Sequence, residues 1–308
     1  MSKSPLTYHV GPHYFCITNN SHIDVIEGLP SLKPFAVPIP DNEELLFTLH
    51  LAETEVGEIR TDQETPTDIN FEWEDAQCLI RPTSDDTYLV AITPQDNIQT
   101  YWMECSDSFR HCTAYLSING EENRIPASTV NFVLNNFLMM LYAFNGARHH
   151  TLLMHASVIA HNGKGYLFLG KSGTGKSTHT SLWLKHIEGC HLLNDDNPVV
   201  HVDNSSKQAT VYGSPWSGKT PCYRNESVPI GAFIRLEQAP QNEISQENAV
   251  RAFVALLPSC SCLKQDKGIY NGIIAAVTEL ASLSPVFHLK CLPDKAAAEL
   301  CQRTVKDK

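Results

Sequence analysis

The sequence feature that most constrains the fold is a glycine-rich stretch at residues 170–177, which reads GKSGTGKS and fits the pattern G-x-x-x-x-G-K-[ST]. We call it the first glycine motif. The apolar run at 166–169 predicts a buried strand before it, and residues 177–186 predict a helix after it. Glycines let backbone N–H groups turn inward around phosphate oxygens, and the helix N-terminus adds partial positive charge. The stretch is therefore predicted to be a phosphate loop.

The side chains of this motif have expected roles. Lys176 would reach the β- and γ-phosphates of a nucleotide, and the hydroxyl of Ser177 would bind Mg²⁺. ATP or another nucleotide and Mg²⁺ are thus the expected cofactors. The predicted nucleotide-binding residues are Gly170, Lys171, Ser172, Gly173, Thr174, Gly175, Lys176, Ser177 and Thr178.

Two adjacent carboxylates, Asp195 and Asp196, directly follow an apolar strand predicted at 191–194. Because neighbouring residues point to different sides, one carboxylate can hold Mg²⁺ while the other faces an acceptor hydroxyl. Proton removal by an aspartate is the usual solution in kinases. A solvated turn is the alternative for this pair. His155 lies in the strand predicted at 152–160, and the residues alone leave both a core role and a functional role open for it.

The rest of the chain predicts an α/β domain with parallel elements, preceded by a smaller β-rich domain. Residues 1–126 are expected to form a small antiparallel sheet, 127–150 a connecting helix, and 151–308 the phosphate-loop domain. The predicted strands of the first part are 14–18, 46–51, 69–73, 87–92 and 113–118. Those of the second part are 152–160, 166–169, 191–194, 199–202 and 230–236, with late helices at about 246–257, 271–282 and 294–303.

Composition excludes several classes of protein. The 308 residues carry 23 Lys and Arg against 34 Asp and Glu, a net charge of −11, which argues against nucleic-acid binding. The most apolar stretch, residues 130–144, is interrupted by asparagines and is too short to span a bilayer. The 10 cysteines include no C-x-x-C pair, so reduced thiols, no zinc site and a cytoplasmic location are expected.

In their order and spacing, His155, the first glycine motif and the Asp195–Asp196 pair resemble the HPr kinase and phosphoenolpyruvate carboxykinase superfamily, and most closely its HPr-kinase-like bacterial members. The resemblance covers about residues 150–235. It implies a domain of that type and a kinase that phosphorylates a hydroxyl. It also implies that Lys176 holds the phosphates, Ser177 and Asp196 hold the metal, and Asp195 acts as base with help from His155. Oligomers are common among such relatives, so a homo-oligomer is open.

A second stretch, residues 213–220, fits the same pattern, and we call it the second glycine motif. Pro221 and a turn-prone segment follow, so no helix can start there, and Pro215 removes a backbone donor. It is predicted to be an ordinary loop. As a hypothesis, it recognises the acceptor, with Trp216 as a platform and Lys219 as a cation.

Three functions remain open from the sequence. The first is a kinase whose acceptor is a serine of a protein or peptide or a small molecule. The second is a nucleotide-binding regulatory or scaffold protein without catalysis. The third is a small carboxykinase relative, although Arg224, Arg235 and Arg251 form no evident dicarboxylate site. The Arg-Gly-rich signature that HPr kinases carry after their Asp pair is missing, which argues against HPr itself as the acceptor.

Overall fold

The computed structural model describes residues 4–19, 24–39, 43–52, 67–73, 76–84, 86–95, 99–116, 126–218 and 220–306. The chain forms two compact units. The first comprises Met1–His9 and His13–Asn145, and the second comprises Val10–Pro12 and Gly146–Lys308. Each unit is built on its own sheet.

The sheet of the first unit has nine strands in the order β3-β1-β2-β4-β9-β8-β7-β6-β5. The prediction of an antiparallel sheet is wrong at two places, because β4 pairs in parallel with both β2 and β9. A short helix, α1 (Val25–Gly28), and a 3-10 helix, η1 (Pro30–Phe35), lie between β2 and β3. The strands are β1 (Leu6–Val10), β2 (His13–Asn19), β3 (Ala36–Val37), β4 (Leu45–Ala52), β5 (Ile69–Trp73), β6 (Ala76–Ser84), β7 (Thr87–Pro94), β8 (Tyr101–Ser106) and β9 (His111–Tyr115).

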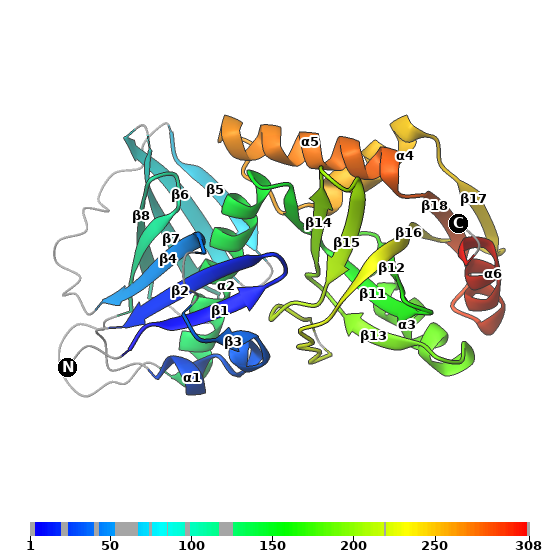
Figure 1. The fold of residues 1–308 in the computed structure, drawn as a ribbon, viewed down its shortest axis with the longest axis horizontal. Helices are drawn as coiled ribbons and strands as arrows, with labels where there is room; N and C mark the ends of the chain where they lie inside the picture. The colour runs from blue at the N-terminus through cyan, green and yellow to red at the C-terminus, as the bar shows by residue number, and fades with distance from the viewer. Residues whose placement is uncertain are drawn as a thin grey trace. The chain divides into compact units, whose positions relative to one another are not determined.

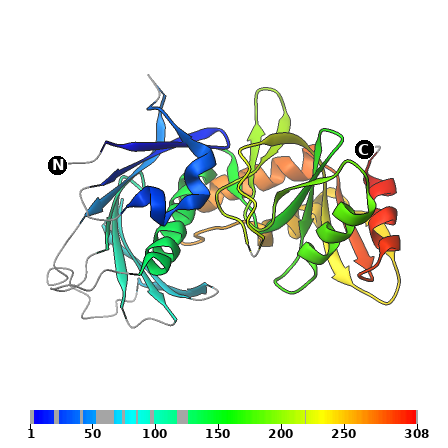
Figure 2. The ribbon, with the colours of Figure 1, turned by 90° about the horizontal axis from the view of Figure 1, so that it is seen from below.

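Helix α2 (Ala127–Ala147) is the core helix of the first unit, up to Asn145, whereas the sequence predicted a connecting helix. The sheet curves around it (Figure 2). Tyr142 of α2 packs edge-on against Phe15, which stacks on Phe47. With 21 residues the helix is long and apolar enough to cross a membrane by length and composition, but 61% of its most apolar window is buried inside the protein. That burial is typical of a core helix.

The second unit contains a mixed sheet in the order β10-β14-β15-β16-β12-β11-β13, with β18 pairing β16 and β17 pairing β18. Strands β12, β16 and β18 run parallel, which confirms the parallel elements predicted for this half. The strands are β10 (Thr151–Leu153), β11 (Ala156–His161), β12 (Lys164–Leu169), β13 (His191–Asn194), β14 (Val199–Asp203), β15 (Gln208–Tyr212), β16 (Ser227–Gln238), β17 (Glu243–Gln246) and β18 (Val286–Cys291).

The helices of the second unit cover this sheet. Helices α3 and α6 pack together over a core that includes Trp183, Phe168 and Phe287. Helix α5 packs across β10, β14 and β15 (Figure 1). The helices are α3 (Lys176–His186), α4 (Ala249–Leu256), the 3-10 turn η2 (Leu257–Ser259), α5 (Lys267–Leu283) and α6 (Lys295–Val305). Helix α3 therefore starts beside the carboxyl end of the parallel strands, where open α/β sheets bind their ligands.

Candidate functional site

The first glycine motif connects β12 to α3, which confirms the predicted strand–loop–helix order; the helix begins at Lys176, one residue earlier than predicted. Gly173 and Gly175 have φ angles of 79° and 106°, a region that favours glycine. No atom lies within 4 Å of where a Cβ of Gly173 would be, so this side of the loop is open. The first N–H groups of α3 have no acceptor within the helix. The loop thus fits an anion such as a phosphate.

Lys176 points back into this loop and is only 8% exposed. Its Nζ donates to the carbonyl oxygen of Gly170 at 3.0 Å and lies 2.8 Å from Nε2 of His155. An ammonium group can only donate, so Nε2 must accept and the neutral imidazole carries its proton on Nδ1. His155 therefore contacts the lysine of the first glycine motif, which favours a functional role over the core role that the sequence also left open.

The other imidazole nitrogen, Nδ1 of His155, lies 3.0 Å from Oδ1 of Asp196. The resemblance had coupled His155 to Asp195, so the structure exchanges the partner within the pair. Asn197 donates from Nδ2 to Oδ2 of Asp196 at 2.7 Å. The Asp196 side chain is 25% exposed, so it stays accessible. Lys176, His155 and Asp196 form one continuous chain of polar contacts.

The carboxylate of Asp195 has other partners than that of Asp196, and Asp195 is only 6% exposed. Its Oδ1 accepts a hydrogen bond of 2.8 Å from the hydroxyl of Ser157 on β11. The same hydroxyl contacts Thr180 Oγ1 at 3.3 Å, and Thr180 in turn donates to the carbonyl of Ser177. Asp195 is thereby tied to the first turn of α3. Asp195 is buried, Asp196 is partly exposed, and both carboxylates have fixed partners, so the pair is not the solvated turn that was the alternative.

The second glycine motif braces the aspartate pair. Among the described residues 213–218 and 220–226 there is no helix, as predicted. The hydroxyl of Ser214 accepts from Asn194 Nδ2 at 3.0 Å and donates to the carbonyl of Asn197 at 2.6 Å. Trp216 is 5% exposed, so its indole offers no open platform for an acceptor. Lys219, the other residue of that hypothesis, lies outside the described residues.

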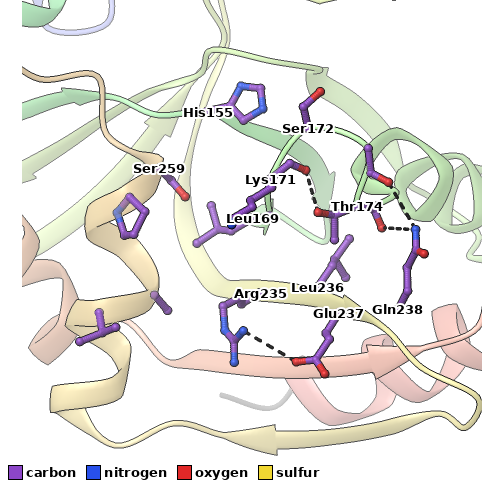
Figure 3. A pocket seen from close by; sticks show the side chains of 15 residues that line it. His155, Leu169, Lys171, Ser172, Thr174, Arg235, Leu236, Glu237, Gln238 and Ser259 are labelled. Carbon is purple, nitrogen blue, oxygen red and sulfur yellow. Dashed lines mark hydrogen bonds and ion pairs between the residues drawn. The ribbon is translucent and has the colours of Figure 1, made fainter.

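A cavity of about 610 Å³ opens between the first glycine motif, the end of β16 and the end of α4 (Figure 3). His155, Lys171 and Ser172 line it together with Arg235 and Gln238. Gln238 braces the loop by donating to the carbonyls at positions 173 and 174, at 3.3 and 3.4 Å. Sequence reasoning missed the β16 residues. The signal for them is their position at the carboxyl end of a strand parallel to β12.

A second cavity of about 630 Å³ borders the same loop at Gly173, Thr174 and Gly175. Thr178, His179 and Leu182 of α3 line it, with apolar residues after β16 and β18. His179 is buried, and burial lowers its pKa to about 4; its Nε2 accepts from Trp183 Nε1 at 3.2 Å. The loop is thus the shared wall of two cavities.

The donors near the loop suit Mg²⁺. Ser177 is exposed at the start of α3, and the carboxylates of Asp195 and Asp196 supply oxygen ligands. Mg²⁺ takes oxygen donors and usually completes its shell with waters and substrate phosphates. Within the described part of the chain, no group of three or more His, Cys, Asp or Glu could hold a metal ion. The site therefore fits a metal shared with phosphate better than a cage made by protein alone.

These features define an α/β protein whose second unit carries a glycine-rich loop between a strand and a helix, with an acidic pair that contacts it through His155. Residues 122–292, more than half of the chain, match the model of the family described as SynChlorMet cassette protein ScmC, so the chain belongs to this family. The comparison with curated proteins gave no match.

Among solved structures, the HPr(Ser) kinase/phosphatase from Coxiella burnetii is similar, with 14% identity over 50% of this chain and 88% of that one. Its TM-score of 0.27 is too low to establish a shared fold.

Proposed function

We propose that the protein is a nucleotide- and Mg²⁺-dependent kinase that transfers a phosphoryl group to a hydroxyl. The observation that carries the proposal is the chain of contacts Lys176–His155–Asp196, which joins the glycine loop to a carboxylate. Phosphoryl transfer needs mainly positioning and charge neutralisation. A loop for the phosphates, a lysine and an accessible carboxylate within one site supply both.

In this proposal the loop and Lys176 hold the phosphates. When a nucleotide binds, Lys176 exchanges contacts with Gly170 and His155 for phosphate oxygens. The Lys176 ammonium then neutralises charge that develops during transfer. Ser177 and Asp195 would hold Mg²⁺, because Asp195 is tied through Ser157 to the first turn of α3. The metal, when bound, offsets the negative charge of the phosphates.

We assign the base to Asp196, where the resemblance had placed Asp195. Its Oδ2 and Oδ1 are held by Asn197 and His155, and its side chain is the more accessible one. A carboxylate fixed in this way can take the proton as the acceptor hydroxyl attacks the terminal phosphorus. His155, with its proton on Nδ1, donates to Asp196 and so orients this carboxylate. The phosphoryl group leaves the nucleotide and ends on the acceptor oxygen.

The two cavities divide the substrates. The 630 Å³ cavity, lined by α3 and apolar residues, would take the nucleoside, and the 610 Å³ cavity, which contains His155, would take the acceptor. The resemblance adds the HPr-kinase type of domain to this proposal and leaves a homo-oligomer open, and the composition adds a cytoplasmic location. The 10 cysteines are all free, in keeping with a reducing compartment.

The test is a phosphorylation screen of cell extract with γ-labelled ATP. The wild-type protein should label at least one hydroxyl acceptor, and Lys176→Ala should reduce the labelling by at least about a thousandfold, as for loss of a key charge-stabilising donor. Lys185→Ala removes an exposed lysine from the same helix and should behave like the wild type. Nucleotide binding without any transfer would instead support the regulatory or scaffold function.

A further inference from the structure

An apolar stripe runs along the outer face of α4 and ends at the acceptor cavity. It consists of Val250 and Val254 on α4 and continues four residues later at Pro258 in the 3-10 turn η2. Residues four apart share one face of a helix. Val250 and Val254 are 75% and 63% exposed, the two highest values among the exposed large hydrophobic residues of the described chain. Isolated exposed valines are ordinary, but a row that leads into a candidate active site is not.

The stripe is fixed to the candidate site by backbone contacts. The N–H of His155 donates to the carbonyl of Ser259 at 2.6 Å, and Met154 pairs with Cys260. Val254 and Pro258 line the cavity that also contains His155 and the first glycine motif. A molecule seated on this part of the stripe is therefore held beside the proposed base and phosphates.

The stripe also extends beyond the cavity, since Val250 does not line it. Val250 and Pro258 are eight positions apart, which at about 1.5 Å per residue corresponds to roughly 12 Å. A small acceptor confined to the cavity would leave Val250 uncovered. An extended or helical polypeptide would cover the whole row while its hydroxyl entered the cavity.

Charges beside the stripe point to the same occupant. Arg251 on α4 and Lys171 in the cavity lining are exposed, whereas Glu247, the acid that contacts both Arg251 and Arg235, is only 8% exposed in its side chain. The side chain of Glu237, which also lines the cavity, is 48% exposed and lies 2.8 Å from His288 and 3.9 Å from Arg235. Three cations, Arg235, Arg251 and Lys171, thus accompany this exposed acid, so the surface offered to a partner near the stripe is apolar with an excess of positive charge.

From these observations we infer that α4 is a docking surface for a polypeptide acceptor in which an apolar residue, accompanied by an acidic one, lies a few residues from the phosphorylated serine or threonine. This inference rests on the proposed kinase function and adds the class of acceptor to it. Val250 and Val254 act as specificity residues, since they contact the acceptor and not the reacting atoms.

The experiment uses the full chain, Mg²⁺, γ-labelled ATP and an arrayed peptide library with a fixed central Ser or Thr. The wild type should concentrate label on peptides with Leu, Ile, Val, Phe or Met at one flanking position. The double variant Val250→Ser/Val254→Ser should lower kcat/KM for the best peptide at least tenfold, mainly through KM. On the same peptide with Ala at the apolar position, the wild type and the double variant should be equal. Both valines are exposed, so the double variant should fold.

Leu283→Ser, an exposed leucine at the end of α5 that is 37% exposed, is the matched control and should keep the wild-type preference. Equal losses on the apolar and Ala peptides would overturn the inference while leaving the kinase function intact. So would labelling of a small molecule in extract but of no peptide, or a change of oligomeric state in the double variant without a change in peptide preference. Absence of MgATP binding in the wild type would overturn the proposed function and this inference together.

Discussion

The two glycine motifs share one pattern of residues, and their glycines serve different purposes. In the first, Gly173 and Gly175 adopt positive φ angles beside open space. In the second, a Cβ on Gly213 would overlap the carbonyl oxygen of Arg224, and one on Gly218 would lie 3.1 Å from Cβ of Asp196. The first motif needs glycine for its backbone conformation, and the second needs it for close packing.

The comparison shows why the flanking residues decide what such a pattern means. A strand that ends at Leu169 and a helix that begins at Lys176 give the first motif a fixed frame and a helix N-terminus. The second motif is followed by Pro221 and an extended segment that leads into β16. It contributes a buried hydroxyl, Ser214, which holds the asparagines on either side of the aspartate pair. One motif thus forms the loop and the other supports the carboxylates beside it.

The largest effect is expected at Asp196, which is joined to the first motif through His155 and lies against Gly218 of the second motif. Asp196→Asn keeps the shape of the side chain and removes the base, so phosphoryl transfer should fall by about a thousandfold. Binding of MgATP should change little, since the loop and Lys176 remain. Single-turnover transfer and equilibrium binding measure the two quantities separately.

Asp195→Asn is the matched variant for this measurement. It should raise the Mg²⁺ concentration needed for half-maximal transfer. A loss of transfer at saturating Mg²⁺ in Asp195→Asn, with near-normal transfer in Asp196→Asn, would reverse the two roles.

The next largest effect is expected on stability, through the packing of the second motif. Gly213→Ala places a methyl group against the backbone of Arg224, so one of the two segments must move. We expect the free energy of unfolding to fall by about 3 kcal/mol, the upper part of the range for overpacking. Urea unfolding followed by circular dichroism measures it. Stability equal to that of the wild type would show that this loop is not tightly packed.

A comparable effect is expected from pH on the helix of the first motif. Burial lowers the pKa of His179 to about 4 from 6.5, so the folded state binds fewer protons than the unfolded state between these values. The free energy of unfolding therefore does not depend on His179 above pH 6.5 and decreases as the pH falls from 6.5 to 4. At 1.36 kcal/mol per pKa unit, the decrease is about 3 kcal/mol.

Urea unfolding between pH 4 and pH 7 tests this dependence. His179→Gln should flatten the profile, and His186→Gln, a change at the last residue of the same helix, should leave it as in the wild type. A profile that is equally steep in His179→Gln would assign the pH dependence to other groups.

The smallest effect on stability is expected at Gly173. Gly173→Ala meets no neighbouring atom, but forces alanine into a left-handed backbone conformation, which costs about 1–2 kcal/mol. Its methyl group would occupy the open side of the loop, so affinity for MgATP should fall at least tenfold. Gly173→Ala should therefore lose mainly affinity for MgATP, whereas Gly213→Ala should lose mainly stability. Tight MgATP binding by Gly173→Ala would remove the distinction between the motifs.

The sequence predicted the local part of the site well, because a strand, a glycine loop and a helix are contiguous in the chain. It also predicted a helix close to α2, but not that this helix is a core element, since periodicity shows an apolar face without showing what covers it. Strands β1, β3, β6 and β8 of the first unit and β15, β17 and β18 of the second unit were missed. Most of these segments are short or polar at alternate positions, so their local pattern is weak. They become strands because they pair with strands that are distant in the sequence.

The rest of the site depends on contacts between residues far apart in sequence. The pairing of His155 with Asp196 in place of Asp195 depends on the side from which β11 meets the turn after β13. Arg235 and Gln238 reach the cavity because β16 lies parallel to β12. The burial of Trp216 follows from the packing of the second motif against Asn194 and Asn197. No local pattern specifies these pairings.

Isothermal titration of the protein with ATP in the presence of Mg²⁺ tests the central claim most directly, since it asks whether the first glycine motif binds phosphate. We predict one site per chain in the wild type, an affinity at least tenfold lower in Lys176→Ala, and unchanged binding in Lys185→Ala. A wild-type protein that releases no heat with any nucleoside triphosphate, or a Lys176→Ala variant that binds as tightly as the wild type, would contradict it.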